Sequence, residues 1–89
     1  MQRQEIEIIN KLGLHARAAA KLVTLAQTYC ADIRIAKNSQ QVNGKSIMGV
    51  MMLAAAKGSL IEVTTEGEDE IEAMQALKQL INNRFDEDE

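Results

Sequence analysis

The sequence contains no proline and no tryptophan, and its only aromatic residues are Tyr29 and Phe85. A core must therefore be built from Ile, Leu, Val, Met and Ala side chains. Cys30 is the only cysteine, which excludes an internal disulfide. No apolar run approaches the roughly 18 residues of a membrane-spanning helix, and the first residues show no signal-peptide pattern. We therefore expect a cytoplasmic protein.

Positive charge is also scarce, because 10 basic residues face 13 acidic ones and the formal net charge is −3. Nucleic-acid binding needs basic patches, and an anionic membrane also attracts positive charge. We expect neither a nucleic-acid nor a membrane partner. The last four residues, 86–89, are all acidic, and we expect this tail to be frayed and solvated.

The 89 residues are enough for one domain over 1–89, with no linker or repeat. A chain of this size buries about 60–65% of its unfolded surface, so the core is modest. Apolar residues that alternate with polar ones predict strands, and those with a helical period predict helices. The expected strands are 5–9, 32–36, 41–42 and 60–65, and the expected helices run from Ala16 to about Tyr29, from Ile47 to about Ala55, and from the acidic stretch at Glu68 onward with an apolar stripe of Ile71, Met74, Leu77 and Ile81.

The predicted element order is β-α-β-β-α-β-α. This order favours an α+β layer, in which helices pack on one face of a four-stranded sheet. Periodicity does not reveal the order of the strands within the sheet.

The only histidine, His15, lies in the stretch Gly13-Leu14-His15-Ala16-Arg17-Ala18-Ala19-Ala20, at or one residue before a predicted helix start. A helix start has unpaired N–H groups and a partial positive charge, so it attracts anions. The imidazole, the Arg17 guanidinium and the backbone amides of Ala16, Arg17 and Ala18 together suit a phosphoryl group. The alternative is that His15 is only a surface residue or a local cap.

A histidine with the usual pKa of about 6.5 is mostly neutral at pH 7 and can act as a nucleophile. The helix start and Arg17 oppose protonation, and both would meet the oxygens of an attached phosphoryl group. We find no zinc-type ligand set, no Walker-type loop and no motif that places a carboxylate beside His15. The sequence therefore favours a phosphoryl acceptor and donor without metal or cofactor, whose chemistry partner proteins complete, rather than a stand-alone enzyme.

The second helix is short and rich in methionine. A helical wheel directs Val50, Leu53 and Ala54 inward and leaves Ile47, Met48 and Met51 outward, although all six could instead belong to the core. Exposed methionines make adaptable binding surfaces. Ser46 stands where an N-cap of this helix is expected.

The stretch from Asn10 to Ala18 resembles the active-site signature of HPr, the histidine-containing phosphocarrier family of the bacterial phosphotransferase system. Asn43-Gly44-Lys45-Ser46-Ile47-Met48 resembles the second conserved region of that family. The resemblance covers the chain from about Glu5 to Phe85. It implies an open-faced β-sandwich with a largely antiparallel four-stranded sheet and three helices on one face. We also expect the protein to be a monomer.

The resemblance further implies that His15 is phosphorylated on Nδ1 by an enzyme I-type protein, which takes phosphate from phosphoenolpyruvate. His15 would then pass the phosphoryl group to a IIA-type protein. In this family the face of the second helix lies beside the active histidine and docks the partners. The resemblance therefore predicts one contact patch of Ala16, Arg17, Ala20, Ile47, Met48 and Met51. In some bacteria the serine that matches Ser46 is phosphorylated by a dedicated kinase, and the alternative is that Ser46 serves only as an N-cap.

Many family members have proline immediately after the arginine, where this chain has Ala18. The nitrogen-related branch, NPr, can have alanine there. Ala18, the stretch from Lys45 to Met48 and the acidic tail favour that regulatory branch over sugar uptake.

Two other functions remain open at this point. The first is a non-catalytic docking module that uses the methionine-rich helix face, with His15 lining an anion site. The second is a nucleic-acid or small-ligand domain of split β-α-β type, which the negative charge and the lack of stacking aromatics disfavour.

Overall fold

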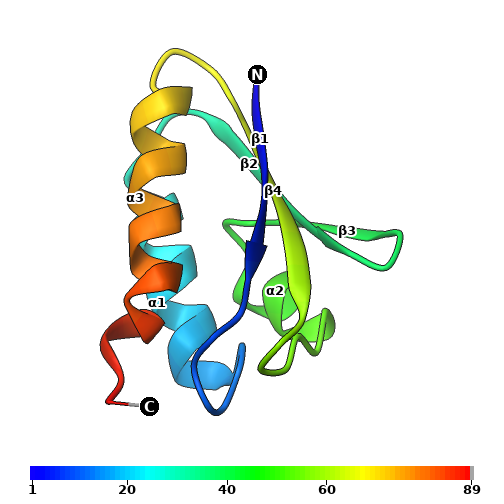
Figure 1. Cartoon of the computed structure of the whole chain (residues 1–89). Coiled ribbons are helices and arrows are strands. Elements are labelled where there is room, and N and C mark those ends of the chain that lie inside the picture. Colours follow the sequence, from blue (N-terminus) through cyan, green and yellow to red (C-terminus); the bar gives the residue numbers. More distant parts are fainter. Residues whose placement is uncertain (89) are drawn as a thin grey trace.

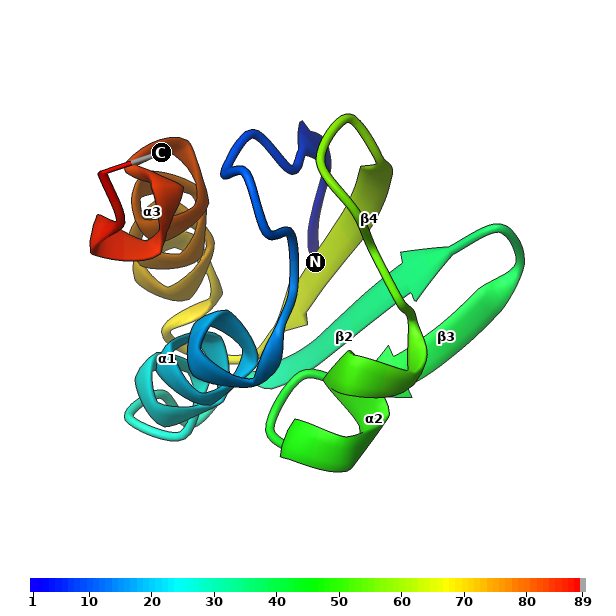
Figure 2. The ribbon, with the colours of Figure 1, turned by 90° about the horizontal axis from the view of Figure 1, so that it is seen from below.

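One antiparallel sheet of four strands, in the order β1-β4-β2-β3, carries three helices on one face in the computed structural model, which describes residues 1–88 (Figures 1 and 2). The α+β architecture and the element order predicted from the sequence are confirmed. The elements are β1 (Gln2–Glu7), α1 (Ala16–Ala26), β2 (Asp32–Lys37), β3 (Gln40–Asn43), α2 (Ile47–Met52), β4 (Leu60–Glu66), α3 (Glu70–Asn82) and a short turn of helix over Arg84–Asp86.

Strand β4 lies between β1 and β2, although it is the last strand in the sequence. It pairs antiparallel with both neighbours, and β3 pairs antiparallel with β2 at the sheet edge. The β2–β3 hairpin turns at Asn38 and Ser39, whose φ angles of 50° and 72° are those of a primed turn. Strands β1 and β2 therefore run parallel on either side of β4, with α1 connecting them.

The core lies between the sheet and the helices. Alternate residues of the strands point toward the helices, because side chains alternate between the two faces of a strand. The other face of the sheet carries polar residues and is open to solvent. The fully buried residues of the strands include Ile33, Ile35, Ile61 and Val63, and those of the helices include Leu22, Val23, Leu77 and Ile81.

Helix α1 ends at Ala26, three residues before the predicted end at Tyr29. The N–H groups of Thr28 and Tyr29 donate to carbonyls only three residues back, which tightens the last turn. The next two N–H groups, of Cys30 and Ala31, donate to the Asp69 carboxylate at 2.8 Å. These contacts with the start of α3 direct the chain away from the helix axis.

Helix α2 ends at Met52 rather than near Ala55. The Lys37 ammonium donates to the carbonyls of Leu53 and Ala54 at 3.4 and 3.2 Å, which satisfies two carbonyls at the helix end. Ala54 has a φ of 49° and its side chain is exposed, so the prediction that it faces inward is wrong. Val50 and Leu53 are buried, as predicted.

Two further sequence expectations need correction. Strand β1 covers Gln2–Glu7 instead of 5–9, because its partner β4 extends the pairing to Gln2 and Thr65. Ile71 is 52% exposed and does not belong to the buried stripe of α3, whereas Ala73 and Met74 are buried.

The chain end differs most from the expectation of a frayed acidic tail. Phe85 is fully buried against the core, and the Lys21 ammonium donates to its carbonyl at 2.8 Å. Glu87 packs back against the loop before α1. The chain end thus packs against the domain through Phe85 and Glu87, whereas the side chains of Asp86 and Asp88 are exposed, as expected for a solvated tail. The expectation also covered Glu89, which lies outside the described residues.

No helix within residues 1–88 is both long and apolar enough to cross a bilayer.

Candidate functional site

The loop that leads to His15 is fixed by backbone contacts on both sides. The buried Asn10 side chain donates to the Gly13 carbonyl at 2.8 Å, and the Leu14 N–H donates to the Ala55 carbonyl at 2.8 Å. Gly13 has a φ of 68°, and a Cβ there would lie 2.4 Å from the Ala55 oxygen. Glycine is therefore needed at this position, both for the backbone conformation and for the close approach to the segment after α2.

His15 is the N-cap residue of α1, with φ −74° and ψ 178°. Its carbonyl accepts from the Ala19 N–H at 2.8 Å, which is the first bond of the helix. The preceding N–H groups, of Ala16, Arg17 and Ala18, thus have no partner within the helix. The His15 side chain is 27% exposed, so the imidazole remains accessible from solvent beside these free donors.

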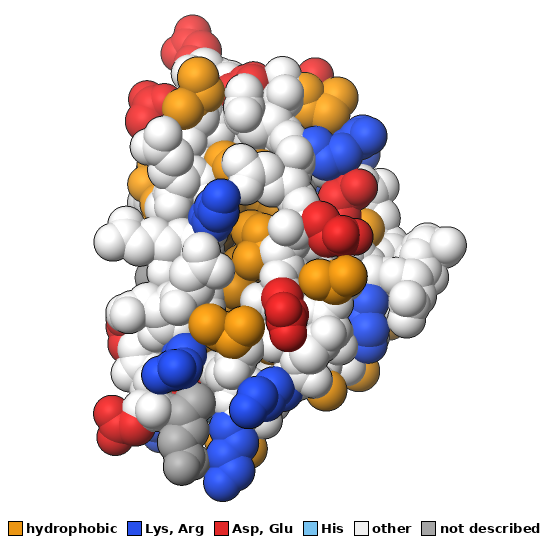
Figure 3. Space-filling model, in the orientation of Figure 1, with side chains coloured by type: hydrophobic (Ala, Val, Ile, Leu, Met, Phe, Trp, Pro, Cys, Tyr) orange, Lys and Arg blue, Asp and Glu red, His pale blue; other side chains and the backbone are white. Residues whose placement is uncertain are grey.

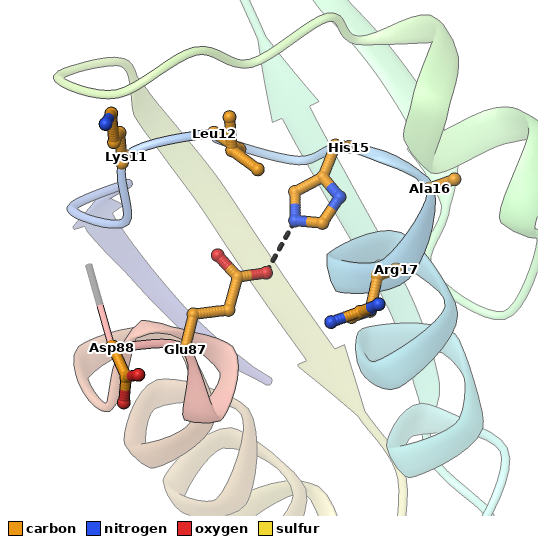
Figure 4. A pocket seen from close by; sticks show the side chains of 7 residues that line it. All are labelled: Lys11, Leu12, His15, Ala16, Arg17, Glu87 and Asp88. Carbon is orange, nitrogen blue, oxygen red and sulfur yellow. Dashed lines mark hydrogen bonds and ion pairs between the residues drawn. The ribbon is translucent and has the colours of Figure 1, made fainter.

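A carboxylate contacts the imidazole from the other side. Glu87 Oε2 lies 2.5 Å from His15 Nε2, and Glu87 Oε1 accepts from Asn10 Nδ2 at 3.1 Å (Figure 4). Burial raises the pKa of the Glu87 carboxyl, but hydrogen bonds from His15 and Asn10 and the charge of Lys21 together lower it more. The net pKa is below the ordinary value, so Glu87 is ionised at neutral pH.

Sequence reasoning missed this carboxylate and found no catalytic partner for His15. Glu87 is 72 residues away in the sequence, in a segment that was expected to be solvated. No local motif signals the contact, because it depends on how Phe85 packs. Glu87 places a negative charge next to the imidazole, whereas the sequence predicts only positive charge there, from Arg17 and the helix start.

His15 stands at the edge of an open hollow, with Arg17 exposed beside it (Figure 4). Lys and Arg side chains gather at the end of the molecule where the C-terminus and the loop before α1 lie (Figures 1 and 3). An anion can therefore reach the imidazole from solvent past cationic side chains. The hollow is lined by Lys11, Leu12, His15, Ala16, Arg17, Glu87 and Asp88.

The predicted contact patch is divided between two helices that pack against each other, α1 and α2. On α2, Ile47, Met48 and Met51 are 44%, 78% and 42% exposed. On α1, Ala16 and Arg17 are exposed, but Ala20 is half-buried and lines a neighbouring groove with Arg17. Only Ala16 and Arg17 of this set line the hollow at His15, so docking through the whole patch stays a prediction.

Ser46 acts as the N-cap of α2, because its hydroxyl accepts from the Gly49 N–H at 3.2 Å. The cap explains the residue without any modification. Within residues 1–88, no group of three or more His, Cys, Asp or Glu side chains could hold a metal ion.

A small α+β domain that presents an accessible histidine at a helix N-terminus, with free amides and an arginine around it, has the features that a protein carrying a phosphoryl group on histidine requires. Residues 2–83 match the family model described as "PTS HPr component phosphorylation site". The chain belongs to the HPr family of phosphocarrier proteins of the phosphotransferase system.

Similar proteins match the chain over its whole length. The phosphocarrier protein HPr of Pseudomonas aeruginosa is 60% identical over 90 residues, and that of Neisseria meningitidis is 58% identical over 89 residues, in both cases covering 100% of each chain. The crystal structure of HPr from Thermoanaerobacter tengcongensis superimposes with a TM-score of 0.97 at 44% identity, again over 100% of both chains.

Proposed function

We propose that His15 accepts a phosphoryl group from an enzyme I-type protein and passes it to a IIA-type protein. The single observation that supports this most strongly is the position of His15 as an accessible N-cap, followed by three backbone N–H groups without helical partners. These donors and the Arg17 guanidinium can meet the phosphoryl oxygens. The hollow is open to solvent, which suits a group that must leave again.

Members of the HPr family are carriers rather than stand-alone catalysts. In this proposal the partner proteins complete each transfer, and the chain works in the cytoplasm as a monomer without metal or cofactor. A relative from Thermoanaerobacter tengcongensis, 45% identical, has been crystallised as an HPr dimer. The mass of the present chain in solution therefore has to be measured to test the monomer.

The exposed apolar residues of α2 provide the proposed docking surface. Ile47, Met48 and Met51 form an exposed apolar face next to α1, and flexible methionine side chains adapt to different partners. Such a surface could also serve a docking module without phosphoryl transfer, which is the alternative function. The two proposals differ in whether His15 becomes covalently modified.

Regulatory nitrogen-type signalling, rather than sugar uptake, is the finer proposal. It rests on Ala18, the stretch from Lys45 to Met48 and the acidic tail. The similar proteins carry the general name HPr, which does not favour either branch. Phosphorylation of Ser46 by a serine kinase is a further proposal, since a phosphate is tolerated at a helix N-terminus.

The test is incubation with phosphoenolpyruvate, magnesium and a matched enzyme I-type protein, followed by intact mass and phosphorus NMR. We expect one added phosphoryl group that is acid-labile and alkali-stable. His15→Ala should show none, because no other histidine exists in the chain. The control is an unrelated carrier that proves the donor protein active.

If the donor phosphorylates the control carrier but not this chain, the carrier proposal is wrong. A His15→Ala variant that keeps its affinity for a partner would then favour the docking module. Transfer onward to sugar-type and nitrogen-type IIA proteins, compared in one assay, would distinguish the branches.

A further inference from the structure

The contact between Glu87 and His15 belongs to a chain of three side chains. The Asn10 amide group, through Nδ2, donates to the Gly13 carbonyl and to Glu87 Oε1. Glu87 Oε2 in turn lies against His15 Nε2. Both neighbours of the Asn10 amide are acceptors, so only the NH2 group can face them. Asn10 therefore fixes the position of the carboxylate relative to the loop that carries His15.

The backbone of the tail also directs Glu87 toward the ring. Arg84, Phe85 and Asp86 have φ angles of 57°, 53° and 63°. This left-handed conformation is disfavoured for residues other than glycine. The buried Phe85 ring and the Lys21 hydrogen bond hold this turn in place. A conformation that the local chain disfavours is thus maintained by tertiary contacts, and it places Glu87 back over the site.

An ionised carboxylate can accept a hydrogen bond but cannot donate one. With Glu87 Oε2 at hydrogen-bond distance, His15 Nε2 must carry a proton in both the neutral and the protonated ring. The lone pair of the neutral ring is then on Nδ1. Figure 4 shows Nδ1 on the side of the ring that faces the first turn of α1, away from Glu87.

We propose that Glu87 is a positioning residue that, held by Asn10, fixes the Nε2-protonated tautomer of His15. This tautomer leaves the lone pair on Nδ1, the nitrogen that the family resemblance already implies as the site of phosphorylation. The proposal deepens the carrier function and rests on it for its catalytic consequence, although the tautomer itself can be measured without any phosphoryl transfer. A carboxylate that orients an imidazole and fixes its tautomer plays the same part in hydrolase triads.

In the transfer step, the Nδ1 lone pair forms a bond to phosphorus while the bond between phosphorus and the donor atom breaks. The electron pair of that bond returns to the donor protein. The proton on Nε2 stays in place, so the ring gains positive charge, which the Glu87 carboxylate offsets. When the phosphoryl group moves on to an acceptor, the electron pair of the N–P bond returns to Nδ1. In this proposal Nδ1 forms the bond to phosphorus, and Nε2 keeps its proton and its hydrogen bond to Glu87.

Asp88 provides a matched control for this proposal. It lines the same hollow and carries the same charge, but it makes no hydrogen bond to the imidazole among the described residues. Glu87→Ala and Asp88→Ala each remove one carboxylate near His15. Only the first removes the ring contact. Glu87→Gln keeps an oxygen that can accept from Nε2 while it removes the charge.

The experiment is nitrogen-15 NMR of the His15 ring in the unphosphorylated full-length protein, with the ring neutral. We expect a protonated Nε2 and an unprotonated Nδ1 in the original protein and in Asp88→Ala. In Glu87→Ala both nitrogen shifts should move toward those of a free imidazole that exchanges between tautomers, and Glu87→Gln should lie between. The initial rate of phosphorylation should fall clearly further in Glu87→Ala than in Asp88→Ala, which removes an equal charge from the same hollow without removing the contact with the ring.

A ring that carries its proton on Nδ1 in the original protein would overturn the proposal, as would identical ring spectra of the original protein and Glu87→Ala. Fixed Nε2 protonation without any phosphoryl transfer would instead leave the positioning role intact and refute the carrier function. The two failures are thus separate.

Discussion

The imidazole of His15 meets charge of opposite sign on its two sides. Glu87 lies against Nε2, and the backbone amides at the start of α1 are free to meet an anion. In the proposed transfer, Glu87 stabilises the positive charge that develops on the ring, and the backbone amides meet the negative phosphoryl oxygens. The carrier proposal thus assigns a different part of the site to each charge.

Arg17 is the residue whose removal should affect transfer most directly after His15. Its exposed guanidinium lines the hollow, and hydrogen bonds to charged groups contribute about 1.5–3 kcal/mol. We expect Arg17→Ala to lower kcat/KM for phosphoryl acceptance by about 10- to 100-fold. Arg17→Lys should recover part of it, since lysine keeps the charge but not the forked donors.

The matched control for Arg17 is Arg3→Ala, which removes an arginine from the far end of β1. Arg3 is exposed, and it makes a loose ion pair with Glu62 at 3.8 Å and a weak hydrogen bond to the Met1 sulfur at 3.9 Å. Equal losses in the two variants would mean that net charge, and not the position of Arg17, determines the rate.

Helix α2 has six residues and depends on its cap, since short helices are marginal by themselves. Ser46→Ala removes the acceptor for the Gly49 N–H and should lower the free energy of unfolding by about 1 kcal/mol. Ser46→Asn, another good cap, should lose much less. Urea denaturation measures both, and equal losses would show that the hydroxyl does not act as a cap.

The start of α3 is tied to the end of α1 through Asp69. The hydrogen bond from the Cys30 N–H is the main factor that lowers the pKa of the Asp69 carboxyl, with burial opposing it and the Ala31 N–H adding to it. Because the pKa is lower in the folded than in the unfolded chain, the ionised group adds stability above its unfolded pKa. That stability is lost as the pH falls through the folded pKa.

Denaturation of the original protein and of Asp69→Asn at several pH values tests this. The original protein should be the more stable at pH 7, and the difference should shrink as the pH falls below about 3.9, the ordinary pKa of an aspartate. Asp32→Asn, which breaks a surface pair with Arg34, should change little at any pH. A difference that stays constant with pH would show that the charge of Asp69 is not involved.

Phe85 joins the tail to the rest of the domain. Its ring is fully buried, and the chain has no other phenylalanine or tryptophan. Phe85→Ala should lower the free energy of unfolding by about 3–5 kcal/mol, a large share of the about 5–15 kcal/mol that is usual for a domain. Phe85→Leu, which keeps most of the volume, should cost about 1.5 kcal/mol or less.

Urea denaturation gives the size of this effect, and the His15 ring spectrum reports on the tail. A Phe85→Ala protein that folds should also show a weakened contact of Glu87 with His15, because the ring anchors the turn. An unchanged stability would mean that the tail does not pack against the core in solution.

The sequence by itself determined much of the domain. Local periodicity predicted each strand and helix, and the helix start at Ala16 placed His15 and Arg17 together. These features depend on residues within a few positions of one another, so the sequence pattern carries them. The exposed face of Ile47, Met48 and Met51 also follows from the helical period.

Only the tertiary structure decided which strand lies between β1 and β2, where α1 and α2 end, and which carboxylate meets His15. Each depends on a contact between residues far apart in the chain, such as Lys37 with Ala54 or Asn10 with Glu87, the latter 77 residues apart. Such contacts contribute free energy only when the sheet and the buried Phe85 bring these segments together. Local sequence patterns therefore do not predict them.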